Sequence, residues 1–224
     1  MAAVWVPLTP LILAGLILPT YLIAEILLLQ SEKGPGKAAA FVSGFVVTKF
    51  VQGVVFGLLF SGVAWGLPKD TRSSITGTML LIAALVFYGF AARSFAHRNE
   101  VAGTSRLLGA LSGLTPGRAF GLGVVANLTS LRLWVFTLGA VTAIQEDHLP
   151  ILEAALIFLG FIILSLSPMI ALALIPYLAP DRSDRVLSAI RSWLLRRAYW
   201  VMLVFGVLVG TAMVWIGLGK LGVL

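Results

Sequence analysis

The sequence has no cysteine, only two histidines, His97 and His148, and few charged residues, which make up 11% of its 224 positions. The lack of cysteine excludes disulfides, thiol catalysis and cysteine-ligated metals. The two histidines fall in or near predicted loops, so a histidine metal site has little support. We find no glycine-rich phosphate loop, no nucleophile beside a base and no carboxylate dyad. We therefore expect a protein that is not an enzyme and holds no cofactor or metal.

Apolar residues dominate what is present, at 59% of the chain. A soluble domain of this size carries about 25% charged residues, so the composition predicts an integral membrane protein. A membrane-spanning helix needs about 20 apolar residues. Six segments meet this length and predict an all-α fold with six spans: 6–30, 38–67, 75–92, 119–145, 149–180 and 198–219.

The net charge of +7 does not indicate nucleic-acid binding, because no groove motif of aromatic and basic residues accompanies it. Basic residues instead collect in cytoplasmic loops of membrane proteins. Three predicted loops, the first, third and fifth, share one side and hold Lys33, Lys37, Arg93, Arg98, Arg106, Arg118, Arg182, Arg185, Arg191, Arg196 and Arg197. The other side holds only Lys69, Arg72 and Lys220. This asymmetry predicts that both termini lie outside the cytoplasm.

Two short amphipathic helices are predicted in the membrane interface, one in each of the longer basic loops. In the connection 98–118, Leu107, Leu108, Leu111 and Leu114 recur at helical spacing. In the stretch 185–197, the apolar set is Val186, Leu187, Ile190, Trp193 and Leu194.

A weak internal repeat divides the chain into a first three-helix unit, 1–97, the connection 98–118, and a second unit, 119–224. Gly44 and Gly160 occupy similar depths in the second helix of each unit, and Leu18-Pro19-Thr20 corresponds to Asn127-Leu128-Thr129. Because three spans is an odd number, the second unit would be inverted in the membrane. Interrupted helices in inverted repeats are typical of secondary transporters, although small residues also recur in spans simply for packing.

Glu25 and Lys49 are two charged residues within predicted spans. Both spans meet the same inner loop, so the side chains can approach, and a pair costs far less than either charge alone. One interpretation is a charge-neutralised relay that a proton or a cationic substrate could break. The alternatives are a static pair, or two side chains that extend separately to the headgroups.

Asn127, Thr129 and Arg132 place an amide, a hydroxyl and a positive charge within the fourth span. This combination suits a carboxylate or a phosphate headgroup. Alternatively, Thr129 bonds to its own helix, while Arg132 extends outward or pairs with Glu153.

Pro19, followed by Thr20, should kink or break the first span and free a backbone carbonyl that needs a polar neighbour. A simple kink is the alternative. We expect this break and the one at residues 127–129 to face each other near the midplane and to border one polar cavity.

The stretch LSGLTPGRAFGLGVVANLTSL, which starts at Leu111, resembles the glycolipid (peptidoglycolipid) addressing protein family of the lysine-exporter superfamily. The first span, LAGLILPTYLIAEILLL, is similar to that superfamily's proline-containing first helix. Members commonly carry Asn-Pro-Lys in the fourth span, whereas this chain keeps Asn127 but has Leu128 and Thr129. The superfamily's disulfide-handling branch uses paired cysteines, which this chain lacks.

The resemblance implies a secondary transporter in the bacterial inner membrane that exports a small polar or charged solute or a lipid-linked molecule. A non-transporting accessory subunit or lipid-organising scaffold is the alternative. The partners would be membrane lipids and the substrate, with a homo-oligomer or a larger membrane complex as further possibilities.

The topology is directly testable, because a chain without cysteine accepts single cysteines as unique labels. A cysteine at Ser188 should react with a membrane-impermeant maleimide only from the cytoplasmic side, and a cysteine at Ser74 only from the outside. Labelling intact and permeabilised cells distinguishes the two sides. The reverse pattern would overturn the predicted orientation.

Overall fold

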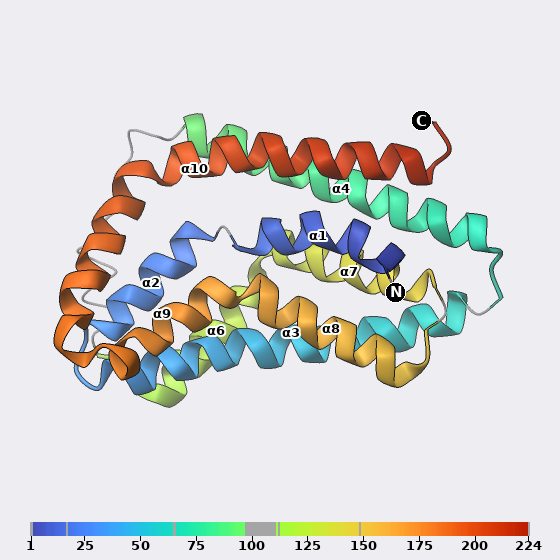
Figure 1. Cartoon of the computed structure of the whole chain (residues 1–224). Coiled ribbons are helices and arrows are strands. Elements are labelled where there is room, and N and C mark those ends of the chain that lie inside the picture. The colour runs from blue at the N-terminus through green and yellow to red at the C-terminus, as the bar shows by residue number, and fades with distance from the viewer. Residues whose placement is uncertain are drawn as a thin grey trace.

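The computed structural model describes residues 2–16, 18–64, 66–96, 111, 113–147 and 149–223, which form helices and contain no strand. The helices lie along one long axis, except for the first part of α10, which crosses the end of the bundle, and the N- and C-termini are together at the opposite end (Figure 1). Their bounds are α1 Ala2–Leu16, α2 Pro19–Leu29, α3 Gly34–Ala64, α4 Lys69–Ala96, α6 Pro116–Thr129, α7 Leu131–Gln145, α8 Ile151–Ser165, α9 Ser167–Leu178, a 3₁₀ turn Pro180–Arg182, and α10 Ser183–Lys220.

Three straight segments are long and apolar enough to cross a membrane: Gly34–Ser61 in α3, Lys69–Arg93 in α4, and Trp200–Lys220 in α10. Large apolar side chains cover their outer faces, including Leu58, Leu85 and Leu208, which are 68%, 73% and 63% exposed. Such a surface is costly in water and suited to lipid. The chain is therefore a multi-pass membrane protein.

Three pairs of shorter helices pass the same test together but are bent: α1 with α2 by 50°, α6 with α7 by 74°, and α8 with α9 by 64°. If each pair is one span, the described chain crosses six times. In Figure 1 each pair runs from one end of the bundle toward the other. The inverted relation between the two halves stays a prediction.

The bends fall where the sequence places groups that break helices. Pro19 is the first residue of α2, and Pro168 is the second residue of α9. Proline lacks a backbone N–H, and at these first positions of a helix an N–H would have no partner within the helix. The break between α6 and α7 has no proline and falls at Ser130, directly after Thr129. The predicted interruption at 19–20 is thus present as a helix break, and the one predicted at 127–129 falls just after that stretch, at Ser130.

One predicted interfacial helix is not a separate element. The basic stretch 185–197 is the first part of α10, which continues without a break into the last span. Figure 1 shows α10 turning sharply between these two parts. The first part is anchored to the end of α2, since Gln30 Nε2 donates to Ser188 Oγ at 3.0 Å and Arg191 donates to Gln30 Oε1 at 3.4 Å. The other predicted interfacial helix, in 98–118, lies mostly outside the described residues.

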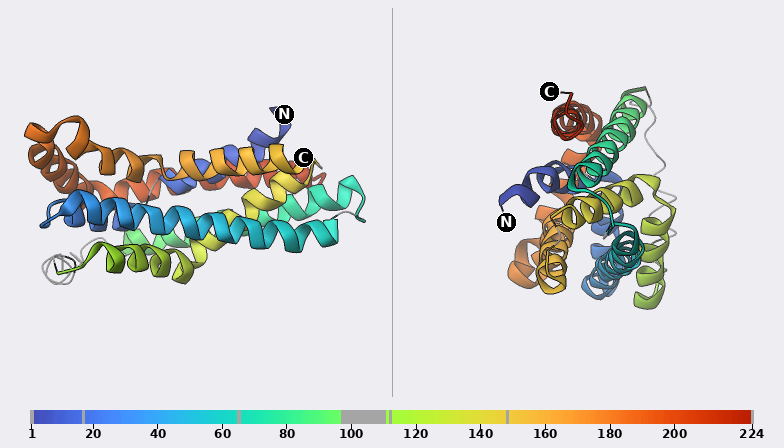
Figure 2. Two further views of the ribbon diagram at one scale, coloured as in Figure 1. Left: turned by 90° about the horizontal axis from the view of Figure 1, so that it is seen from below. Right: turned by 90° about the vertical axis from the view of Figure 1, so that its right-hand side faces the viewer.

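Glycines bring α3 and α6 into backbone contact, and the two helices lie side by side in Figures 1 and 2. A Cβ atom on Gly44 would meet Phe120 O, and a Cβ atom on Gly123 would meet Phe41 O. Close approach through small residues is a common way for helices to associate in membranes. Gly160 has more room, because a Cβ atom there would lie 3.6 Å from the Trp5 ring.

Replacement of Gly44 by alanine should therefore lower the free energy of unfolding by about 1–3 kcal/mol, because two backbones must separate to admit the methyl group. Gly57→Ala, on the same helix, is the matched control, since a Cβ atom there meets nothing within 4 Å. Thermal unfolding in detergent measures both. Equal melting temperatures for the two variants would show that the α3–α6 contact is not tight.

Candidate functional site

The break between α6 and α7 leaves backbone carbonyls that cannot bond along the helix. Two side chains donate hydrogen bonds to these carbonyls. The Tyr21 hydroxyl, from α2, donates to Ala126 O at 3.4 Å, and the Trp134 indole N–H donates to Leu128 O at 2.8 Å. A carbonyl without a partner at membrane depth costs several kcal/mol. The two donors therefore make the break tolerable within the bundle.

Tyr21 also joins the two predicted interruptions. It lies two residues after Pro19, and its ring packs against Phe45 of α3 with centroids 5.1 Å apart. Since its hydroxyl reaches the last turn of α6, the first turn of α2 lies beside the end of α6. The two breaks are therefore within reach of one tyrosine side chain, while the polar cavity that we expected between them stays a prediction.

Asn127 is the central polar residue of this site and is fully buried. Its Nδ2 donates to Phe45 O at 3.4 Å, which ties α6 to α3. Its Oδ1 is buried without a hydrogen-bond partner. Buried polar atoms are nearly always satisfied in proteins, so this oxygen marks a place where a further donor is needed.

Arg132, in the first turn of α7, is 7% exposed, and its guanidinium lies over the Phe90 ring of α4 at 4.9 Å from the centroid. Its Nε is buried without a partner. Tyr21 lies within electrostatic reach of the guanidinium. The ion pair with Glu153 that we considered is not formed among the described residues, and neither does Arg132 extend to the surface.

The predicted pairing of Glu25 with Lys49 is wrong for this structure. Glu25 is fully buried in α2, and both of its carboxyl oxygens lack a hydrogen-bond partner. Lys49 is 1% exposed, and its ammonium lies 5.0 Å from the centroid of the Phe161 ring. Sharing an inner loop brought the two helices together, but it did not turn the two side chains toward each other.

Two of the predicted site residues face outward. Thr20 is exposed although Pro19 beside it is buried. Thr129 is exposed as well, and its hydroxyl donates to Val125 O of its own helix at 2.8 Å. The hydroxyls of these two residues therefore do not border the buried site, whereas Asn127 and Arg132 do.

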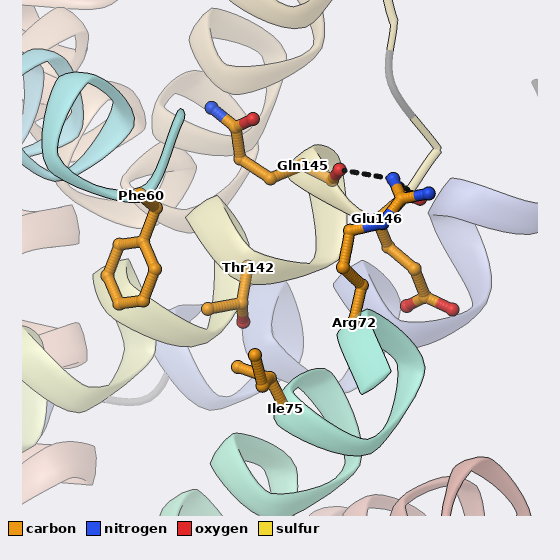
Figure 3. Close-up of a pocket in the computed structure, with 6 residues that line it drawn as sticks. All are labelled: Phe60, Arg72, Ile75, Thr142, Gln145 and Glu146. Atoms are coloured by element: carbon orange, nitrogen blue, oxygen red, sulfur yellow. Dashed lines mark hydrogen bonds between the residues drawn. The ribbon is translucent and has the colours of Figure 1, made fainter. Parts of the chain in front are cut away.

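A second polar cluster, which the sequence did not reveal, closes the end of the bundle near the termini (Figure 3). Arg72 of α4 donates to Glu146 O at 2.7 Å and to Gln145 O at 3.4 Å, so it caps the carboxyl end of α7. Lys220 of α10 forms an ion pair with Glu146 at 2.6 Å. These contacts fasten α4, α7 and α10 together beside a small cavity lined also by Phe60, Ile75 and Thr142.

A larger groove of about 440 Å³ lies between α3, α7 and α8. Its lining is mainly apolar, with Ser61 and Gln145 as polar members. Gln145 is itself bonded to Gly57 O at 3.3 Å. Because Val54, Leu58 and Ile151 border the groove and are exposed on the outer face of the bundle, the groove opens toward the region that lipid would fill.

The fold and the site define a multi-pass helical membrane protein with bent helix pairs, two of which meet near buried, partly unsatisfied polar groups. The sequence matches the family described as Sap, sulfolipid-1-addressing protein, over residues 8–219. The chain belongs to this family. The expected likeness to a family of lipid-addressing membrane proteins is confirmed at that level, while the placement in the lysine-exporter superfamily stays a prediction.

No curated protein matches the chain, and no solved structure matches it. Tyr21, Trp134 and Arg72 are the site residues that sequence reasoning missed. For Tyr21, its position two residues after a helix-breaking proline was an available signal. The roles of Trp134 and Arg72 depend on backbone carbonyls freed at helix ends, which no side-chain pattern reports.

The isolated carboxyl of Glu25 generates a stability prediction. Glu25→Leu should raise the free energy of unfolding by about 1–3 kcal/mol, because it removes two buried oxygens that have no partner. Lys49→Met should combine with it almost additively, within about 0.5 kcal/mol, since the two side chains form no ion pair. Detergent melting of both single variants and the double variant measures the coupling; a coupling of several kcal/mol would instead show a pair.

Proposed function

We propose that this protein is a secondary transporter that exports a lipid-linked molecule, or a small polar or charged solute, across the membrane that it spans. The observation that carries the proposal is the meeting of two broken spans at Tyr21 and Ala126, next to unsatisfied polar atoms of Asn127 and Arg132. Broken helices at matched positions typically form the substrate sites of transporters.

Two kinds of contact join the helices, and they would behave differently during a transport cycle. The close contact of α3 with α6, at Gly44 and Gly123, holds one broken span to a straight one. At the end near the termini, Glu146, Arg72 and Lys220 join α7 to α4 and α10. Breaking these polar contacts while the apolar contacts persist would open one end of the bundle, which is how alternating access proceeds.

An amphiphilic substrate suits the combination of a buried polar site with an apolar groove. The polar group would contact the break between α6 and α7, and a hydrocarbon chain would lie on the apolar, lipid-facing surface of the bundle, to which the groove between α3, α7 and α8 also opens. Membership of a family named for addressing a sulfolipid favours this substrate class. The proposal includes the lysine-exporter architecture of inverted halves, a bacterial inner membrane, both termini outside the cytoplasm, and no enzymatic step.

A non-transporting accessory subunit or lipid-organising scaffold is the second candidate. One observation favours it: Glu25 and Asn127 are fully buried, so in this conformation neither group is open to a substrate from water. The same burial is expected of a transporter in an occluded state. Transport by the purified protein alone separates the two functions, because a scaffold would not catalyse lipid movement.

The test is a lipid-movement assay in proteoliposomes, with and without a pH gradient. A phospholipid with an anionic headgroup and a fluorescent acyl chain is placed in both leaflets, and dithionite quenches the outer leaflet. We expect protein-containing vesicles to export the probe faster than protein-free vesicles. No acceleration with any anionic, zwitterionic or neutral probe would favour the scaffold.

Tyr21→Phe should slow this export about 2- to 10-fold, because it removes the hydrogen bond that joins the two breaks. Tyr177→Phe, which removes the same hydroxyl from a residue 64% exposed at the end of α9, is the matched control and should export at the normal rate. Equal rates for both variants would show that the contact between the breaks has no part in transport.

A further inference from the structure

α7 begins without a capping side chain. Its N-cap residue, Ser130, makes no side-chain capping bond, although serine is among the residues that favour this role. The backbone N–H groups of Leu131 and Arg132 have no hydrogen-bond partner among the described residues. Unpaired N–H groups and the helix dipole give this end a partial positive charge that attracts anions.

The Arg132 side chain adds a full positive charge at the same place. Side chains on a helix lean toward its N-terminus, and Arg132 is the second residue of α7. The residue is 7% exposed, its Nε has no partner, and its ring contact with Phe90 satisfies no N–H donor. Among the described residues, no carboxylate neutralises this guanidinium, and two N–H groups of the same helical turn have no acceptor. These groups form a set of donors that lacks an anion.

The residues around these donors indicate what kind of ligand supplies the acceptor. Val125, Leu128 and Leu131 flank the break and are 55%, 46% and 69% exposed, so the outer side of the break is apolar. In a membrane this face is covered by lipid. A ligand that brings an oxyanion to Arg132 and leaves a hydrocarbon chain among these residues would satisfy both surfaces.

We propose that the N-terminus of α7 and the Arg132 guanidinium together bind the sulfate, phosphate or carboxylate headgroup of an anionic amphiphile that enters sideways from the membrane. The N–H groups of Leu131 and Arg132 donate to one oxygen, and the guanidinium donates to the others through its paired N–H groups. This inference rests on the proposed function, since it names the substrate group that the break site holds.

Trp134 provides the binding signal, because its indole donates to Leu128 O at the break. Purified protein in a neutral maltoside detergent is titrated with decyl sulfate, and tryptophan fluorescence is recorded in the full chain and in Trp134→Phe. We expect a saturable change with decyl sulfate that Trp134→Phe loses, a far weaker response to inorganic sulfate, and none to decyltrimethylammonium. Equal affinity for inorganic sulfate would show that the ligand is a free anion and not the headgroup of an amphiphile. No saturable response to decyl sulfate would show that the anion site does not exist.

Arg132→Gln should weaken decyl sulfate binding about 10- to 100-fold, as expected for the loss of a hydrogen bond to a charged group. Arg132→Lys should fall between, since it keeps the charge but loses the two-pronged geometry. Arg118→Gln is the matched control, because it removes one exposed arginine near the start of α6 and should bind like the unchanged protein. Equal losses in both glutamine variants would overturn the site.

Ser130→Asp keeps the test decisive even if Arg132→Gln fails to fold. An aspartate at the N-cap should accept the free N–H groups of α7, raise the melting temperature and prevent decyl sulfate binding. Ser130→Asn supplies a neutral cap and should raise the melting temperature while weakening decyl sulfate binding less. Normal binding by Ser130→Asp would overturn the inference.

The two proposals fail separately. If the fluorescent lipid moves in the unchanged protein but Arg132→Gln and Ser130→Asp bind decyl sulfate normally, the transport proposal stands and the anion site is wrong. If decyl sulfate binds as described but no lipid moves, the anion site stands on its own and the transport proposal is wrong.

Discussion

A break in a helix within a membrane must be satisfied by the protein, because lipid offers no hydrogen bonds. This constraint governs the centre of the bundle. At the end of α6, Tyr21 and Trp134 reach across helices to bond the freed carbonyls of Ala126 and Leu128. The Tyr21 hydroxyl links α2 to the end of α6, and α3 packs against both helices.

The carbonyls at this break are satisfied, but the donors on its other side are not. In the part of the chain that the structure describes, the first two N–H groups of α7 and the Arg132 Nε–H have no acceptor. A protein that only needed stability could cap α7 with an aspartate at residue 130. Leaving these donors open costs stability, and a cost of this kind at a buried site usually accompanies binding or conformational change.

Two kinds of contact hold the helices around this centre. Close backbone contact at Gly44 and Gly123 depends on tight van der Waals packing, which is lost if α3 and α6 separate. The links from Glu146 to Arg72 and Lys220 at the end of the bundle are polar and can be exchanged for water. Near that end, α4 and α10 also meet through close backbone contact at Gly77 and Gly217. Exchange of the polar links for water would therefore free the end of α7, while α4 and α10 stay together.

The sequence alone determined the class of the protein and most of its layout. Apolar runs of about 20 residues predicted six spans, of which three are straight helices and three are bent helix pairs in the structure. Two of the bends fall at Pro19 and Pro168. These features are local, because length, hydropathy and proline chemistry act within one segment. The resemblance at residues 111–129 led to a lipid-addressing family, which the match over residues 8–219 supports.

Only the tertiary structure decided which polar groups meet. The sequence allowed Glu25 and Lys49 to pair, yet the rotation of α2 and α3 about their own axes leaves neither with an ion-pair partner among the described residues. Thr20 and Thr129 face outward for the same reason. Tyr21, Trp134 and Arg72 gained their roles because backbone carbonyls of distant helices came within reach. Helix rotation and contact between distant segments are set by packing of the whole bundle, and no single segment of sequence contains that information.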